Sequence, residues 1–389
     1  MKRNVKLILL SSIILINSFA ATACWNYREV ENLAIVAGTA VDKGENARYK
    51  LTVEIVKIAA GNNAVTESKL ISSEGETIFD CARNAIAVSG KRLYWSHNKI
   101  LIISKEIAEK GVIEMIDWFN RDSETRANVH LAISTEDTAE EIFKGNEVTQ
   151  AIKAFEMEDM LKNEASLSKA PRVEIWEFAN NMAEEGIHGC VAAVKLEETD
   201  SGEKVPSVGG TAIFRGDKLI GIVDEDDTKD ILFAQDNIKG GLLVETIKGK
   251  EKEKEIPVTF EIFKSKTKIK PVISGNNIKI NIDIETTVTL AELGGSKNLI
   301  EEKGREELAE LTETILKNRI EKTVKKIQKD YGTDIFGFGK KIYENDYKEW
   351  QKLRGDWDER FKKSEVNVKT KILIKNSAML SKPLEVKVK

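Results

Sequence analysis

The first 25 residues constrain this chain most, because they determine where the rest of it must fold. Three basic residues lie within the first six positions, an apolar run extends from Leu7 to Ile16, and three small residues precede Cys24. This order is typical of an export signal. The apolar run is too short for a membrane-spanning helix, which needs about 20 residues. We therefore expect residues 1–23 to be a signal peptide that is removed.

Cys24 follows the small residues directly, so removal of the signal would leave a thiol at the new amino terminus. Such a cysteine can carry a diacylglyceryl group and a further acyl chain, and two or more chains hold a protein stably to a bilayer. Ala21 and Ala23 also satisfy the Ala-x-Ala pattern of ordinary secretion, so a free secreted protein is the alternative. We predict lipidation at Cys24 and a folded body close to the membrane surface.

Composition argues against a nucleic-acid-binding protein and against a protein with further membrane-spanning segments. Removing residues 1–23 takes away three of the 60 lysines and arginines and none of the 64 aspartates and glutamates, which leaves a formal net charge of −7. Bulk charge therefore argues against a nucleic-acid partner. The 389 residues suffice for two or three domains, and no second long apolar segment follows the signal. The mature chain therefore lies on a membrane surface or is free of it.

Alternation and helical spacing predict strands interleaved with helices in residues 24–200. Strands from Leu33 to Val41 and from Tyr49 to Ile55 should form a hairpin whose second strand is half exposed. A polar loop is predicted for residues 61–73 and a single helix for residues 105–120. Further predictions are helices at 74–88, 140–161 and from Pro171 to Gly186, and strands at 100–103, 128–134 and 191–196. This order indicates an α+β domain whose sheet is covered on one face.

The charged stretch from Glu197 to Ser207 lacks apolar periodicity and is the best domain boundary in the chain. It divides the mature protein into domains 24–200 and 201–389, the second open to further division. Gly216-Asp217 should turn a hairpin, and residues 224–235 should form a helix with an acidic first turn. The same acidic run fails as a calcium loop, because its sixth position is Lys229 where such loops have glycine.

The second domain contains the clearest strand and the clearest helix. Alternation from Asn277 to Leu290 predicts an antiparallel strand with one solvated face. The helix from Arg305 to Lys329 keeps a period of 3.6 residues and should lie across the C-terminal sheet. A solvated turn or strand edge at 248–255 and closing strands at 366–374 and 384–388 complete the domain. The predicted fold is α+β, with mixed antiparallel sheets, covering helices and two to three lobes.

Motifs for catalysis, cofactors and metals are absent from the sequence. His97, His130 and His188 stand far apart, and none has a metal-ligand partner three or four residues away. No nucleophile elbow, phosphate loop or dinucleotide fingerprint occurs. His130 lies in an apolar strand and should be a hydrogen-bonded structural residue. We therefore expect no enzymatic activity, no cofactor and no metal.

Cys81 and Cys190 are the only candidates for a disulfide once Cys24 is set aside. Cys81 falls on the apolar side of a predicted helix, which favours a buried thiol over a bridge. Whether the two cysteines are bonded stays open at this point.

Two large aromatic residues alternate with glycines after the long helix, as Phe336, Gly337, Phe338 and Gly339. These glycines follow a helix, so we do not expect them to place a helix N-terminus on a phosphate. A tight turn with positive φ beside buried rings is the simpler interpretation, and contact with a partner is the alternative. Both rings should pack against the long helix, and Trp350 on a following short helix belongs to the same candidate region.

Several separated segments, in order from Cys24 to the C-terminal region, carry a family resemblance. They are Cys24-Trp25 with Arg28 to Leu33, Val41 to Lys43, Ser96-His97 with the strand to Ile103, Trp118 to Arg126, Gly210 to Phe214, Lys218 to Gly221, Asp224-Glu225, Tyr331 to Gly339, and Trp350. The chain thereby resembles the C-subunit lipoproteins of bacterial spore germinant receptors, the Ger(x)C family. It departs from the family at Ala21, where the lipidation signal usually has Leu.

The resemblance implies a lipid-anchored, non-enzymatic receptor subunit on the outer face of the spore's inner membrane. Such subunits act with two integral-membrane subunits in nutrient-triggered germination, and the germinant is generally ascribed to a membrane subunit. The family's fold is a mixed α/β body, for which three lobes are an option.

Two rival classes also start with a lipidated cysteine. A solute-binding lipoprotein of an import system would show repeated βαβ units about a two-lobe hinge, whereas the strands here alternate with solvated faces. A lipid-anchored hydrolase needs a nucleophile and base that the sequence does not show.

Overall fold

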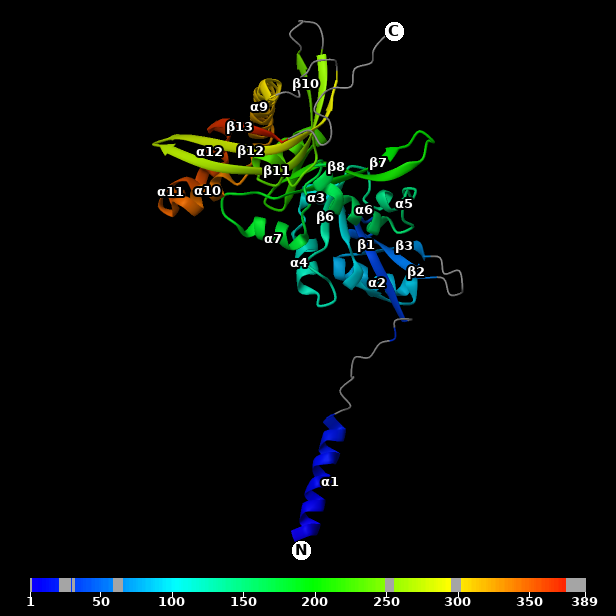
Figure 1. Ribbon diagram of the computed structural model, residues 1–389. Coiled ribbons are helices and arrows are strands. Elements are labelled where there is room, and N and C mark those ends of the chain that lie inside the picture. The colour runs from blue at the N-terminus through cyan, green and yellow to red at the C-terminus, as the bar shows by residue number, and fades with distance from the viewer. Residues whose placement is uncertain are drawn as a thin grey trace.

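The computed structural model describes residues 2–20, 29, 32–58, 66–248, 255–294 and 302–375. Cys24, the predicted strand at 384–388 and most of the predicted turn at 248–255 lie outside the described residues. Helix α1 (Lys2–Ala20) precedes a body built on two sheets (Figure 1). Within the described ranges, no helix combines the length and apolar character needed to cross a membrane.

In the described part of the chain, nine strands form the larger sheet, in the order β3-β2-β1-β5-β6-β7-β8-β9 with β4 beside β1. They are β1 (Leu33–Lys43), β2 (Tyr49–Ile58), β3 (Thr66–Gly75), β4 (Arg92–Tyr94), β5 (Ile100–Ser104), β6 (His130–Ser134), β7 (Cys190–Glu198), β8 (Lys204–Arg215) and β9 (Lys218–Val223). Strands β1, β5, β6 and β7 pair in parallel, and the flanking strands pair antiparallel. The sheet thus has a parallel centre and two antiparallel flanks.

Helices cover both faces of this sheet, so the prediction of a sheet covered on one face is wrong. Leu101 and Ile103 of β5 pack in a cluster with α2 (Ile78–Ser89), α4 (Ile113–Arg121) and α7 (Ile175–Ala183). The alternate residues Ile100 and Ile102 pack in a separate cluster with α5 (Glu140–Lys144) and α6 (Lys153–Lys162). Parallel strands need crossover connections, and here these supply helices to both faces.

The second strand of the hairpin is also more buried than predicted. Thr52 and Glu54 of β2 are fully buried, and the Glu54 carboxylate accepts hydrogen bonds from the first two backbone N–H groups of α6, at 2.9 and 2.8 Å. Asp42 of β1 does the same for α5, accepting from the N–H groups of Ala139 and Glu140 at 2.6 and 3.0 Å. Burial raises the pKa of both carboxyl groups, although these hydrogen bonds oppose the shift. Two buried acids therefore hold two helices on the same face of the sheet.

Several predicted elements differ from the structure. The helix predicted at 140–161 is two helices, α5 and α6, which residues 145–152 separate. Strand β3 occupies residues 66–75, where a loop to residue 73 was predicted, because its polar sequence pairs with β2 along its whole length in antiparallel register. The helix predicted at 105–120 is divided at Gly111, where φ is 130°, into α3 (Lys105–Lys110) and α4. Helix α7 begins at Ile175 instead of Pro171, after a capping box between Glu174 and Glu177.

The smaller sheet has the order β10-β11-β12-β13 in the described ranges. Its strands are β10 (Leu242–Lys248), β11 (Glu255–Ser274), β12 (Asn277–Leu293) and β13 (Glu365–Lys375). Strand β12 alternates as predicted, pairing antiparallel with β11 and parallel with β13. Helix α8 (Glu225–Ala234) has the predicted acidic first turn, and the Asp224 side chain accepts from the Asp227 N–H at 2.9 Å.

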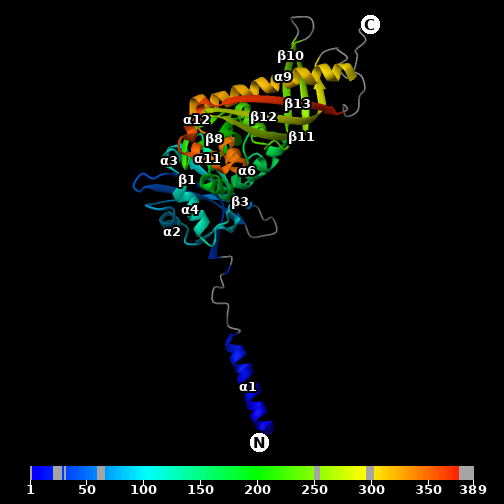
Figure 2. The same cartoon turned by 90° about the vertical axis from the view of Figure 1, so that its left-hand side faces the viewer.

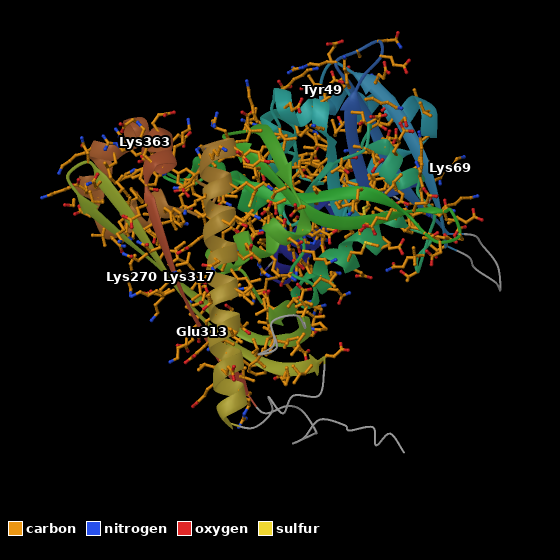
Figure 3. All side chains as sticks on the ribbon, turned by 90° about the horizontal axis from the view of Figure 1, so that it is seen from above. Tyr49, Lys69, Lys270, Glu313, Lys317 and Lys363 are labelled. Atoms are coloured by element: carbon orange, nitrogen blue, oxygen red, sulfur yellow. The ribbon has the colours of Figure 1, made fainter. Side chains whose placement is uncertain are left out.

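The predicted long helix is α9 (Glu302–Lys326), which runs along β13 (Figure 2). It buries Leu308, Leu316, Ile320 and Val324 in the core, whereas Leu311 is 38% exposed. Glu313, which lies on α9 in Figure 3, accepts from the Ile372 N–H at 2.8 Å, and Glu321 accepts from the Val368 N–H at 3.1 Å. The helix therefore satisfies donors on the outer edge of β13, which would otherwise be free to pair with another chain.

The hairpin of β8 and β9 turns at Gly216-Asp217 as predicted. Both strands extend the larger sheet beyond residue 200, since β8 pairs with β7 from Glu198↔Lys204 to Cys190↔Ile213. The division into domains 24–200 and 201–389 stays a prediction. The α+β class, the mixed sheets and the long helix over the C-terminal sheet are as expected.

Candidate functional site

The candidate residues Phe336 to Gly339 and Trp350 lie together where the larger sheet meets the C-terminal elements. A π-helical turn (Ile327–Tyr331) ends α9, and the chain then forms α10 (Phe338–Asn345), α11 (Tyr347–Leu353) and α12 (Trp357–Lys363). We call residues 331–340 the Asp334 turn.

Asp334 is fully buried and its carboxylate accepts four hydrogen bonds. The donors are the backbone N–H groups of Phe336, Gly337 and Gly339, at 3.0, 2.9 and 2.8 Å, and the indole N–H of Trp357, at 3.0 Å. Burial raises the pKa of Asp334 to about 6, although these hydrogen bonds oppose the shift. One acidic side chain therefore organises both the turn and the start of the next helix.

The glycines of the turn lead into a helix, so the prediction that they only follow one is wrong. Gly337, with φ of 75°, is the N-cap residue of α10, and Gly332, with φ of 57°, caps the preceding π-helical turn. One helix ends and the next begins within six residues. The periodicity of the sequence did not reveal this second helix start. Asp334 itself occupies the anion position at the new N-terminus, where the unpaired N–H groups favour negative charge.

The two phenylalanines are buried, as predicted. Phe336 and Phe338 are 4% and 0% exposed, and their rings stack with centroids 5.1 Å apart. Both also approach Phe361 of α12, at 6.4 and 6.1 Å, in the cluster that contains the buried residues of α9. Burial supports the structural interpretation of these rings over direct contact with a partner.

Trp350 is 2% exposed and closes the same cluster. Its ring meets Trp357 edge to face, with centroids 5.5 Å apart. Its indole N–H donates to the Glu185 carboxylate in the segment between α7 and β7. Trp350 therefore connects the C-terminal helices to the larger sheet.

The same segment, residues 184–189, is bonded to the Asp334 turn through backbone groups. The His188 N–H donates to the Asp334 carbonyl at 2.8 Å, and the Lys340 N–H donates to the Gly186 carbonyl at 2.9 Å. Backbones approach so closely that a Cβ at Gly186 would lie 2.4 Å from the carbonyl carbon of Gly339. We call the segment 184–189 and the Asp334 turn together the joint.

Two further elements bind the Asp334 turn. Arg215 of β8 donates from Nη2 to the Tyr331 carbonyl at 2.6 Å and from Nε to Thr333 Oγ1 at 3.1 Å. Gln235, just after α8, donates to the Ile335 carbonyl at 2.7 Å. The turn therefore receives bonds from both strand and helix elements of its surroundings.

His188 adds a polar link to α12. Its Nδ1 accepts from the Gly216 N–H at 3.2 Å, so Nε2 carries the proton that points to Asp358 Oδ1 at 3.3 Å. Burial alone would raise the pKa of Asp358, but the His188 hydrogen bond and the nearby Arg215 charge outweigh it and hold that pKa below its usual value.

Two cavities of about 690 Å³ each flank segment 184–189. One is lined by Trp176, Cys190, Gln235 and Phe336, among others, and the second by Trp350, Trp357 and Asp358. Cys190 is buried, which raises the pKa of its thiol to about 11, so it is no thiolate nucleophile at neutral pH. Cys81 is likewise a buried free thiol, as predicted.

No group of three His, Cys, Asp or Glu side chains that could hold a metal occurs within the described ranges. His97 is exposed beside the Tyr94 ring. His130 is buried, which lowers its pKa to about 4 and keeps it neutral. Its Nδ1 has no hydrogen-bond partner in the part of the chain that the structure describes, contrary to our expectation of a hydrogen-bonded ring.

Sequence reasoning selected the aromatic residues of the joint but missed Asp334, Trp357 and Gly186. An aspartate three residues before Gly337 was an available local sign, because aspartate often accepts from backbone N–H groups in turns and at N-caps. Gly186 and Trp357 carry no comparable sign, since their partners are distant in the sequence.

Two family models match the chain in succession. "Spore germination protein N-terminal domain" matches residues 26–196, and "Spore germination B3/ GerAC like, C-terminal" matches residues 209–378. The chain is similar to Spore germination protein B3 of Bacillus subtilis (strain 168), with 27% identity over 366 residues, covering 91% of this chain and 94% of that protein. It is 23% identical to Spore germination protein GerQC of Bacillus cereus, covering 94% and 98%.

A solved structure has the same fold. The crystal structure of the GerBC protein matches with a TM-score of 0.54 and 23% identity, covering 87% of this chain and 97% of that chain. The match therefore covers most of both chains.

Proposed function

The chain belongs to the Ger(x)C family of spore germination proteins, and from this membership we propose that it is a lipid-anchored, non-catalytic subunit of a spore germinant receptor. It has a role in spore germination in the context of a receptor complex. In our proposal it acts with integral-membrane subunits on the outer face of the spore's inner membrane during nutrient-triggered germination.

The observation that carries this proposal is the pair of consecutive family models, which together extend from residue 26 to residue 378. They begin two residues after Cys24 and together cover most of the proposed mature chain. The export-signal layout of residues 1–23 supports anchoring through an acylated Cys24.

A binding and structural role agrees with the chemistry of the joint. Titratable groups in the joint and beside it are engaged. In the joint, Asp334 accepts from four donors and Glu185 accepts from Trp350; on the adjoining helix α12, Asp358 is paired with His188 and Arg215. These contacts are suited to holding two parts of a protein in one geometry. They do not form the nucleophile and base that a lipid-anchored hydrolase needs.

The alternative of a solute-binding lipoprotein is less well supported. That class needs two lobes of repeated βαβ units, whereas the larger sheet is mixed and the smaller sheet is mainly antiparallel in the described chain. The presence of cavities beside segment 184–189 does not by itself favour a solute-binding role over a receptor-subunit role.

Replacement of the anchor residue tests the proposal. In Cys24→Ala the protein should move from the membrane to the soluble fraction, lose its acyl mass and impair nutrient germination, because the acyl chains are its proposed hold on the bilayer. Its thermal unfolding should be unchanged. The measurements are fractionation of spores, mass spectrometry of the mature terminus and germination in response to nutrients.

Cys81→Ala is the matched control, since it makes the same substitution at a buried thiol. It should leave fractionation unchanged and lower stability only moderately. Membrane retention of Cys24→Ala together with an unmodified wild-type terminus would reject the lipid anchor.

A further inference from the structure

The first of the two cavities beside segment 184–189 lies between the larger sheet and the C-terminal elements. Part of its wall comes from the end of α6, the 3₁₀ turn η3 (Asn163–Ser166) and α7. The rest comes from α8, the residues after it, and Phe336 of the Asp334 turn. A volume of about 690 Å³ is typical of small-molecule sites, which often lie between structural units. We call this space the Trp176 cavity.

Apolar side chains form much of the wall of the Trp176 cavity. Trp176 is 45% exposed, although tryptophan is a highly buried residue on average. Its indole N–H already donates to the Glu174 carboxylate at 2.6 Å, so the ring is the part that is available to a ligand. Other apolar residues of the wall are Leu161, Pro171, Val173, Ile187 and Phe336. A molecule with an apolar body is therefore stabilised here by leaving water.

Two cations of the wall have no partner in the part of the chain that the structure describes. Arg172, just before α7, and Lys239, after α8, form neither a hydrogen bond nor an ion pair there. Both side chains are exposed, so they are accessible to a ligand. Lys162, a further cation of the wall, is instead paired with Glu158 at 3.1 Å.

The acidic side chains of the wall are already engaged. Glu177 accepts from a backbone N–H in the capping box of α7 at 2.9 Å, and Glu184 is paired with Lys340 at 2.7 Å. Glu164 is buried and accepts from the Ala170 N–H at 3.0 Å. Burial raises the pKa of Glu164 to about 7, so it carries only part of a negative charge at neutral pH. The charge that the wall leaves unmatched is therefore positive.

Both unpaired cations approach η3, from two different elements. The charges of Arg172 and Lys162 both act to lower the pKa of His130, so the two cations lie near one another. Lys162 directly precedes η3. A Cβ at position 240, next to Lys239, would lie 2.4 Å from the Ala165 carbonyl oxygen of η3. An anionic group held near η3 is therefore within the surroundings of both unpaired cations.

We propose that the Trp176 cavity binds a small carboxylate with an apolar body. Arg172 and Lys239 bind the carboxylate, and arginine can do so through two parallel hydrogen bonds. The Trp176 ring packs against the apolar body. Asn180 and Asn181 also line the cavity, and their amides have no hydrogen-bond partner within the described ranges, so they can bind a polar substituent.

A ligand in this cavity contacts both sides of the joint. The wall combines α7, which packs on the larger sheet, with Phe336 of the Asp334 turn. Binding therefore adds contacts between the larger sheet and the C-terminal elements. The inference concerns the folded body alone and does not depend on the lipid anchor.

Three probes with one phenylpropyl body and different head groups test the charge of the ligand. They are 3-phenylpropionate, 3-phenylpropan-1-ol and 3-phenylpropan-1-amine, titrated into the purified full-length protein in a calorimeter near neutral pH. The carboxylate should bind at least about tenfold more tightly than the alcohol, because it accepts charge-assisted hydrogen bonds. The amine should bind no more tightly than the alcohol. No binding of the carboxylate at millimolar concentration, equal affinities for the three probes, or tightest binding of the amine would overturn the proposal.

Removal of the two cations tests where the carboxylate binds. Arg172→Met with Lys239→Met should weaken the binding of 3-phenylpropionate by about tenfold or more and leave that of the alcohol unchanged. Lys264→Met with Lys268→Met removes the same charge from β11, outside the cavity, and should change neither affinity. All four positions are exposed, so unfolding without ligand should match that of wild type. Equal losses in the two double variants would overturn the assignment to this cavity, in favour of attraction by bulk charge.

The fluorescence of Trp176 tests the position of the apolar body. The chain has six tryptophans, and the change in emission caused by 3-phenylpropionate should be largely lost in Trp176→Phe. The control Trp118→Phe replaces a tryptophan of the core cluster around α2 and α4 and should retain the change. A change in emission that persists in Trp176→Phe would overturn the assignment, because the ligand would then lie elsewhere.

Discussion

The Asp334 carboxylate accepts a hydrogen bond from the Trp357 indole nitrogen at 3.0 Å, across a gap of 23 residues. The same carboxylate caps the backbone of its own turn, so it connects the start of α10 to the start of α12. An acidic residue in a fully apolar setting is costly unless its donors are in place. The joint therefore has a residue on which both its local geometry and its long-range contacts depend.

Asp334→Ala should destabilise the protein by about 3 kcal/mol or more, because it leaves several buried N–H groups without an acceptor. The matched control is Asp346→Ala, which removes the exposed N-cap of α11 and its single bond to the Glu349 N–H at 3.0 Å. The control should cost about 1 kcal/mol. Urea unfolding of both variants is the measurement, and equal losses would show that Asp334 is an ordinary cap.

The pKa of Asp334 predicts a distinct pH dependence. A folded-state pKa of about 6, above the ordinary value of 3.8, means that the folded protein takes up a proton first as the pH falls. This contribution to stability is fully present below about pH 4 and is lost as the pH rises through about 6. The unfolding free energy of wild type minus that of Asp334→Asn should therefore shrink by up to about 3 kcal/mol between pH 4 and pH 7. A difference that grows with pH would mean that the pKa is lowered.

Gly186→Ala should disrupt the joint more than its backbone angle alone explains. Gly186 has φ of 77° and a neighbouring backbone 2.4 Å from the added Cβ, whereas Gly202 has φ of 80° and open space. Gly202→Ala should cost about 1 kcal/mol, since only the left-handed conformation is penalised. Gly186→Ala should cost at least about 2 kcal/mol more, because the backbones must also separate. Thermal unfolding compares them, and similar shifts would show that the close approach is readily relieved.

Arg319 should be the most sensitive charged residue of α9. It donates to Asp230 at 2.7 Å and to Glu245 at 2.8 Å, and the two acceptors are nearly buried. Arg319→Met leaves both acids without their cation and should cost about 3–5 kcal/mol. Lys270→Met breaks the exposed pair with Asp283 and should cost less than about 1 kcal/mol. Denaturant unfolding at neutral pH measures both, and a small loss for Arg319→Met would mean that water compensates the acids.

Elements with one buried face were predictable, because their periodicity is local. The alternation of β12 and the acidic first turn of α8 both follow from neighbouring residues. The errors lie where a distant segment provides the partner. Strand β3 has a polar sequence and is a strand because β2 pairs with it, and Glu54 is buried because α6 needs an acceptor for its first N–H groups.

The residues of the candidate site also fall into two groups, those predictable from the local sequence and those that depend on a distant partner. Phe336 and Phe338 were predicted to be buried from their size and their glycine neighbours, and they are. The start of α10 at Phe338 was missed, because the position of a helix N-terminus depended on which carboxylate would cap it.

The sequence by itself determined the α+β class, the long helix and most turns, because each depends on residues within a few positions of one another. Only the tertiary structure decided that the larger sheet is covered on both faces and that Asp334, Gly186 and Trp357 meet in one joint. The physical reason is that burial and hydrogen-bond partners are set by residues far apart in the chain. No local sequence pattern indicates which of these distant residues will lie together in one site.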